Sequence, residues 1–142
     1  MNANELRIGN FIFFDSQLKI GKHLEVATIE NYGVRAFNGI VDEKGNRHLT
    51  ALIPFSVVEP IPLTEELLLK FGFEISRSFN GIDAKINDFY LWKGDGWDYW
   101  DYSTVNDRWQ KCNEVNVEIK HVHQLQNLYF ALTGEELQLK PE

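Results

Sequence analysis

The sequence predicts an α+β fold built from short strands and two helices. Segments rich in β-branched and aromatic residues alternate with turn residues at a spacing that suits β-hairpins, whereas two other segments have the period of a helix. We therefore expect an N-terminal small SH3-like β-barrel or curled sheet in residues 1–62. Residues 63–142 should supply a short linking helix and an antiparallel β-meander closed by a C-terminal amphipathic helix. Because the loops are short, both parts are expected to pack as one unit.

Four short strands are expected in the N-terminal part. They are Phe11–Phe14, Leu24–Glu30, Gly33–Val41 and Arg47–Ile53. Turn residues such as Asn38-Gly39 separate them, since these residues tolerate positive φ angles or bond their own backbone. So many short strands in about sixty residues favour closure, because a closed sheet leaves no exposed edge.

The first helix is expected at Glu65–Phe71. Thr64 suits the N-cap, and the acidic residues of the first turn interact favourably with the helix dipole. Gly72 suits a left-handed C-cap. The chain then reads as a meander whose strands are Glu74–Phe79, Lys85–Lys93, Trp97–Ser103 and Arg108–Cys112, with a further strand within Glu114–Lys120.

The second helix is expected at Val122–Thr133. Val122, Leu125 and Tyr129 fall on one helical face, and polar residues occupy the other sides. Gly134 ends the helix, and the polar tail Glu135–Glu142 is expected to fray.

The composition narrows the class of protein. Of 142 residues, 44% are hydrophobic and 25% charged, which excludes a disordered or fibrous chain as the main interpretation. Fourteen basic residues against 21 acidic ones give a formal charge of −7, so the surface repels phosphate and argues against nucleic acid as a partner. No segment approaches the ~20 apolar residues that cross a bilayer, and we expect no membrane partner. A single cysteine, Cys112, cannot form an internal disulfide, which indicates a cytoplasmic location.

Three stretches carry a resemblance to a known family. They are Leu6-Arg7-Ile8-Gly9-Asn10, the run from Val58 to Glu66 with Lys70 to Glu74, and the run from His121 to Gly134. In these motifs the chain resembles a family of small uncharacterised proteins of gut Bacteroidetes, often found in prophages and other mobile elements. The resemblance implies a cytoplasmic protein of a bacterial cell or its phage. It brings no established activity, cofactor or catalytic residue.

The candidate site is the aromatic-rich segment around Trp97–Tyr102. If this segment is a strand, Trp97, Tyr99 and Asp101 share one face, and the residues between them share the other. Each face then has two aromatic rings and a carboxylate, which suits stacking against a flat ligand or a partner. An ordinary half-buried strand explains the same pattern. The candidate ligand- or partner-binding residues are Trp92, Trp97, Asp98, Tyr99, Trp100, Asp101, Tyr102 and Trp109.

We expect no catalytic residue set, no metal site and no cofactor. His121 and His123 would share a face on an extended segment, but a zinc site needs further ligands, and the other candidates lack recognisable spacing. Those candidates are Cys112, His23 and His48. The sequence also lacks a phosphate-binding loop, a dinucleotide fingerprint and a serine nucleophile elbow.

The leading hypothesis is a non-enzymatic binding or adaptor protein of a phage or mobile element. Its acidity points to a protein partner or a homo-oligomer, because aromatic patches with charged rims suit such interfaces. We expect the interacting patch on the side of Trp100. One alternative is a carbohydrate-binding or carbohydrate-active protein that uses the same rings, with Asp98 or Asp101 as acid or base. A further alternative is an acidic mimic of nucleic acid.

Overall fold

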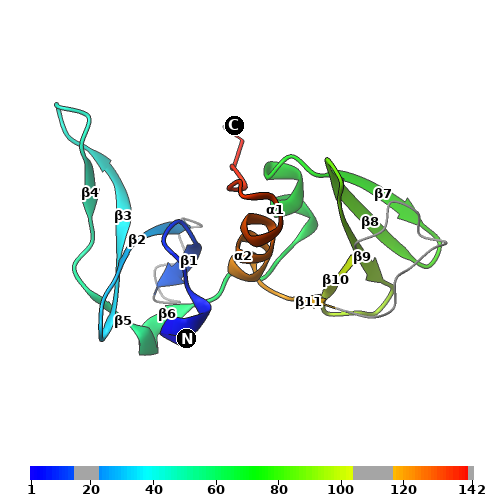
Figure 1. Cartoon of the computed structure of the whole chain (residues 1–142), viewed down its shortest axis with the longest axis horizontal. Coiled ribbons are helices and arrows are strands. Elements are labelled where there is room, and N and C mark those ends of the chain that lie inside the picture. The colour runs from blue at the N-terminus through cyan, green and yellow to red at the C-terminus, as the bar shows by residue number, and fades with distance from the viewer. Residues whose placement is uncertain (15–22, 104–116, 141–142) are drawn as a thin grey trace. The chain divides into compact units, whose positions relative to one another are not determined.

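The strand segments form two separate antiparallel sheets in the computed structural model, which describes residues 1–14, 23–103 and 117–140 (Figure 1). The chain divides into two units. Unit 1 comprises Met1–Ile61 with His121–Asn127, and unit 2 comprises Pro62–Lys120 with Leu128–Glu142. The division lies next to the expected boundary after Pro62. The second helix, however, contributes its first half to unit 1 and its second half to unit 2.

Unit 1 contains a six-stranded sheet with the path β4-β3-β2-β1-β6, and β5 also pairs with β3. The strands are β1 (Phe11–Phe14), β2 (Leu24–Ile29), β3 (Gly33–Val41), β4 (Arg47–Leu49), β5 (Ile53–Pro54) and β6 (Val58–Glu59). Two 3-10 turns, η1 (Ala3–Glu5) and η3 (Phe55–Val57), accompany them. The expected strand at Arg47–Ile53 is therefore two short strands. The sheet is not closed into a barrel, and the SH3-like barrel remains a prediction.

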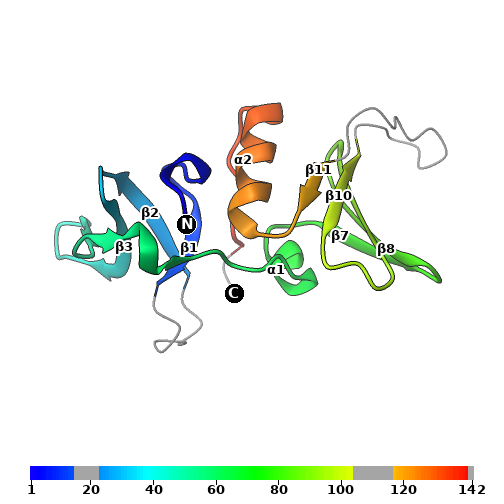
Figure 2. The ribbon, with the colours of Figure 1, turned by 90° about the horizontal axis from the view of Figure 1, so that it is seen from below.

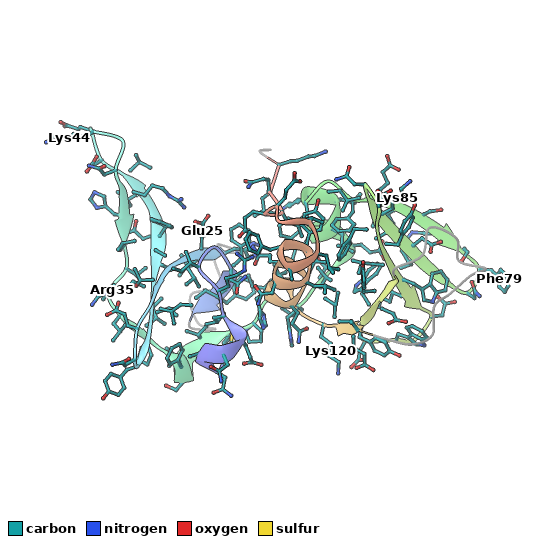
Figure 3. All side chains as sticks on the ribbon, viewed as in Figure 1. Glu25, Arg35, Lys44, Phe79, Lys85 and Lys120 are labelled. Atoms are coloured by element: carbon teal, nitrogen blue, oxygen red, sulfur yellow. The ribbon has the colours of Figure 1, made fainter. Side chains whose placement is uncertain are left out.

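The core of unit 1 lies on one side of this sheet. Its buried residues are Leu6, Ile12, Val26, Val34, Ala36, Ile53 and Val58. Alternation places Val34 and Ala36 of β3 toward this core. Beyond Asn38 the strand continues into an exposed hairpin with β4, and Lys44 lies at its tip (Figure 3).

Helix α1 (Glu65–Lys70) lies near the start of unit 2, and residues next to it in the sequence determine where it begins and ends. The Thr64 hydroxyl accepts a hydrogen bond from the Leu67 N–H at 3.2 Å, as expected of an N-cap. Gly72 has φ +95°, and the Phe73 N–H donates to the Leu68 carbonyl at 3.0 Å, so the helix ends in a left-handed glycine cap.

The sheet of unit 2 is an antiparallel meander in the order β11-β10-β9-β8-β7 (Figure 1). Figure 2 shows β11 and β10 side by side in this sheet. Its strands are β7 (Glu74–Ser78), β8 (Gly81–Ile86), β9 (Phe89–Gly94), β10 (Trp100–Ser103) and β11 (Val117–Ile119). The meander is confirmed, but the single strand expected at Lys85–Lys93 is wrong. Asn87 adopts φ 51° and, with Asp88, forms a two-residue hairpin turn between β8 and β9. The strand expected at Arg108–Cys112 lies outside the described residues.

One face of this sheet, here called the inner face, carries the core of unit 2. Its buried residues include Ala84, Phe89, Leu91, Trp100 and Ile119. The Phe89 ring lies 6.2 Å from the Phe73 ring and 5.2 Å from the Tyr129 ring, both at steep angles. These edge-to-face contacts fix the inner face against the end of α1 and the second half of the C-terminal helix.

Helix α2 (Val122–Thr133) has the bounds that the sequence predicts. The tail after it does not fray as expected. Leu137 is buried, and the Lys140 N–H donates to the Lys70 carbonyl at 2.7 Å. Burial of Leu137 and this backbone bond to the end of α1 therefore anchor the tail.

Candidate functional site

The aromatic-rich segment is only partly a strand. Trp97, Asp98 and Tyr99 belong to the connection between β9 and β10, and regular pairing begins at Trp100. The expectation of a continuous strand from Trp97 is therefore wrong. Gly96 explains the difference, because its φ of +81° extends the turn by placing the chain in a left-handed conformation.

Two of the candidate residues lie on the inner face. Trp100 is 2% exposed, and the Tyr102 ring packs 4.6 Å from the Phe89 ring. Burial raises the pKa of the Tyr102 phenol. Trp100 thus belongs to the core, and the expected interacting patch on its side is wrong, because a fully packed ring has no surface to offer a partner.

The opposite face of the sheet, here called the outer face, carries the other candidates. Residues paired across an antiparallel ladder share a face. Trp92 of β9 lies opposite Asp83 of β8 and opposite Asp101 of β10. The same row continues to Ser76 of β7 and Glu118 of β11, which pair with these two aspartates. The outer face therefore presents one indole with a carboxylate on either side.

Two glycines make room for the aromatic rings on the outer face. Gly81 and Gly94 lie directly opposite each other in β8 and β9. A Cβ atom at Gly81 would lie 2.5 Å from the Trp92 ring, and one at Gly94 would lie 2.7 Å from the Trp97 ring. Each indole thus covers a glycine, an arrangement known to support weak positions in a sheet.

Further rings extend this aromatic cover. Tyr99 stacks on Trp97 with ring centroids 4.9 Å apart and an angle of 15° between the planes. Tyr90 lies on the same face in the next row, with the Lys85 ammonium 5.4 Å from its centroid. Trp92, Trp97, Tyr99 and Tyr90 are all half-buried, so part of each ring remains exposed.

The candidate carboxylates differ in their surroundings. Asp101 is 4% exposed, although it lies on the outer face. Asp98 is exposed, and its Oδ2 lies 3.8 Å from the Lys120 Nζ, a surface pair that contributes little to stability. Neither arrangement shows two carboxyl groups across a cleft, as acid and base catalysis on a glycoside requires. Trp109, the last candidate, lies outside the described residues.

A second concentration of polar groups lies in unit 1, where sequence reasoning found none. Asn10 and Gln126 are almost fully buried. Gln126 of α2 accepts from the Phe11 N–H at 2.8 Å and donates to the Gly9 carbonyl at 3.1 Å. Asn127 accepts from the Asn10 side chain at 2.8 Å and donates to the Glu5 carbonyl at 3.0 Å.

This polar network explains two of the three motifs that carry the family resemblance. Leu6-Arg7-Ile8-Gly9-Asn10 is an irregular segment whose backbone groups need partners, and Gln126-Asn127 of α2 supplies them. Asn10 also accepts from the Arg7 N–H at 2.7 Å and so shapes the turn itself. Because these polar atoms have partners within unit 1, we assign the network a role in stabilising the fold.

His123 lies beside this network and is 3% exposed. Burial lowers the pKa of its imidazole, His121 lowers it further, and Glu5 acts in the opposite direction. The His121 and His123 rings stack at 5.8 Å. Among the described residues no three potential metal ligands gather around a point.

A hollow of about 370 Å³ is lined by Glu30, Asn31, Tyr32 and Leu52 of unit 1. It holds one carboxylate and one phenol, without a histidine, cysteine or second carboxylate to complete an acid–base pair.

In the described part of the chain, no helix is both long and apolar enough to cross a membrane. Comparison of the sequence and structure with family models, curated proteins and solved structures finds no match.

Sequence reasoning missed Asp83 and Tyr90, although a signal for both was present. Asn87-Asp88 is a two-residue turn, and counting outward from it pairs Asp83 with Trp92 and Lys85 with Tyr90. A single strand at Lys85–Lys93 places no turn at Asn87-Asp88 and so predicts no such pairing. The burial of Trp100 and the exposure of Trp92 had no comparable local signal.

Proposed function

We propose that this chain is a non-enzymatic binding protein whose interaction surface is the outer face of unit 2. The observation that carries this proposal is the position of Trp92, Trp97, Tyr99 and Tyr90 away from the core, each with part of its ring exposed. An outward sheet face is ordinarily polar, and its aromatic residues are not needed to form the core, which Phe89, Leu91 and Trp100 already fill.

Aromatic residues of this kind are typical of protein interfaces. Tyr and Trp are enriched among the residues that dominate binding energy, because they bury a large area while losing little conformational freedom. Charged residues around them form the polar rim. Glu118 and Lys85 supply such charges at the border of the outer face. A partner protein is therefore the favoured ligand, in keeping with an adaptor of a phage or mobile element.

A carbohydrate ligand is the alternative that the same geometry supports. A half-buried indole beside Asp83 can stack on a sugar ring while the carboxylate accepts hydrogen bonds from hydroxyl groups. The hypothesis of a nucleic-acid mimic gains no support here. Among the described strand residues, the row beside Asp83, Trp92 and Asp101 holds Glu74, Lys85 and Tyr90, so no second row of carboxylates runs parallel.

Acrylamide quenching of tryptophan fluorescence tests the proposal, with Trp92→Phe, Trp97→Phe and Trp100→Phe compared with wild type. We expect the quenchable share of emission to fall in the first two variants. It should rise in the third, the matched core control, because removal of a buried ring leaves the exposed rings a larger part of the emission. Light scattering on the same samples gives the oligomeric mass. Loss of the quenchable share on dimer formation would identify a second copy as the partner. Equal, weak quenching of all variants in a monomer would contradict the proposal.

A further inference from the structure

We propose that the outer face of unit 2 binds an arginine-bearing basic segment of a partner protein, with the guanidinium stacked on Trp92 beside Asp83. This inference rests on the proposed function, because it names the chemistry of the partner that the same surface takes.

The geometry of the central row supports a planar cation. Trp92 lies in β9, the middle strand of five, and Asp83 and Asp101 lie directly opposite it in the two neighbouring strands. Cross-strand pairing places the Cβ atoms of Asp83 and Trp92 about 5 Å apart. Asp83 is partly exposed, whereas Asp101 is 4% exposed. A guanidinium over the indole therefore has an accessible acceptor on the side of β8.

The charge of the outer face complements such a partner. Its described strand positions carry Glu74, Asp83, Asp101 and Glu118 against the single ammonium of Lys85. The whole chain has a charge of −7, which increases the attraction for a basic segment at low ionic strength. A neutral sugar would gain nothing from this imbalance.

The outer face already contains one cation above an aromatic ring. The Lys85 ammonium lies 5.4 Å from the Tyr90 centroid, in the row beside Trp92. Trp is a better cation–π partner than Tyr. The ring with the stronger attraction is therefore the one beside Asp83.

Arginine fits this arrangement better than lysine. Its guanidinium is planar, stacks on aromatic faces and donates in its own plane, whereas an ammonium is a compact and strongly hydrated charge. Asp83 already has an interaction within the chain. A carboxylate offers about four acceptor sites, so this partly exposed side chain retains capacity for a further donor.

Peptide titration tests the inference. The probe is a nine-residue peptide, Gly-Arg-Gly-Ser-Arg-Ser-Gly-Arg-Gly, with matched peptides in which citrulline or lysine replaces each arginine. Citrulline keeps the planar shape and most of the donors but removes the charge. Affinities are measured by calorimetry on the full chain at about 0.05 M and 0.2 M salt, where screening differs strongly.

We expect the arginine peptide to bind at least tenfold more tightly than the citrulline peptide, and the lysine peptide to lie between them. Trp92→Leu keeps an apolar side chain but removes the π-system, and should weaken binding roughly three- to thirtyfold. Asp83→Asn should weaken it and reduce its salt dependence. Glu43→Gln, an exposed site in unit 1, changes the net charge equally and should have no effect beyond general screening.

The contrary outcomes separate this inference from the proposed function. Equal binding of arginine and citrulline peptides, with loss in Trp92→Leu, would overturn the inference while leaving an aromatic binding surface. Binding of arginine peptide that responds equally to Asp83→Asn and Glu43→Gln would also overturn it, since only net charge would matter. If every peptide fails while glycans bind in a Trp92-dependent manner, the partner is a carbohydrate. If neither peptides nor glycans bind and acrylamide does not quench the tryptophans, the proposed function is overturned as well.

Discussion

Two regions contain side chains that are uncommon in their surroundings. The polar network of unit 1 buries polar groups, and the outer face of unit 2 exposes part of several aromatic rings. In unit 1, the polar side chains of Asn10 and Gln126 are buried, and their hydrogen bonds go to backbone and side-chain atoms of the same unit. In unit 2, large aromatic rings remain partly exposed on the face away from the core. The difference teaches that unusual placement alone does not mark a site. A polar group whose partners lie within the fold stabilises it, whereas exposed aromatic surface gains stability only when something covers it.

The largest effect is expected in the polar network. Gln126→Leu keeps the side-chain volume but leaves the Phe11 N–H and the Gly9 carbonyl without their partner. A buried group left unsatisfied costs about 1–3 kcal/mol, so we expect a loss of about 3 kcal/mol in the free energy of unfolding. Urea denaturation measures it. Gln138→Leu in the exposed part of the tail is the matched control and should change stability little. A loss below about 1 kcal/mol for Gln126→Leu would show that water replaces the bonds.

The link between Asn10 and Asn127 should show coupling. Each single alanine variant is expected to lose about 2 kcal/mol, because each side chain joins the other and a backbone group. The double variant should lose about 1 kcal/mol less than the sum, since contacting residues are not additive. A double-mutant cycle in urea measures the difference. Additive losses would mean that the two residues act separately and that the network is not one unit.

In the sheet of unit 2, substitution of an aromatic residue should cost little stability on the outer face and more on the inner face. Trp92→Leu is expected to cost about 1 kcal/mol or less, because the ring is half-buried and Leu retains cover over Gly81. Trp100→Leu on the inner face removes a fully packed ring and should cost about 3 kcal/mol. Thermal or urea unfolding of both variants compares the two faces directly. Equal losses would assign Trp92 to the core and end its role as a surface.

The smallest effect is a dependence on pH at His123. Burial lowers the pKa of this imidazole below its usual value near 6.5, so the unfolded chain binds a proton more readily than the folded one. Stability should therefore be full above about pH 6.5 and fall as the pH decreases below it. His123→Gln should remove part of that fall, whereas His48→Gln at an exposed site should not. Denaturation midpoints between pH 7.5 and 5 measure it, and an identical slope in both variants would exclude His123 as the source.

Local signals predicted the elements whose ends depend on near neighbours. Helix α2 has the predicted bounds because apolar residues recur at helical spacing and Gly134 follows. Helix α1 begins after Thr64 and ends before Gly72 for reasons contained in the same few residues. For the candidate site the sequence predicts one continuous strand, whereas Trp97–Tyr99 lie in the turn and Trp100 lies in the core.

Periodicity, caps and turn residues act within a few positions, and they are enough to predict the α+β class, the two helices and most of the hairpins. Three features become visible only in the folded chain: the covered face of the meander, the contact of Gln126 with the segment before Phe11, and the docking of the tail at Lys70. All three depend on residues that lie far apart along the chain. Burial and hydrogen bonding at these positions depend on partners as far as 115 residues away in the sequence. The hydrophobic period and the turn residues of a segment do not encode which other segment will cover it.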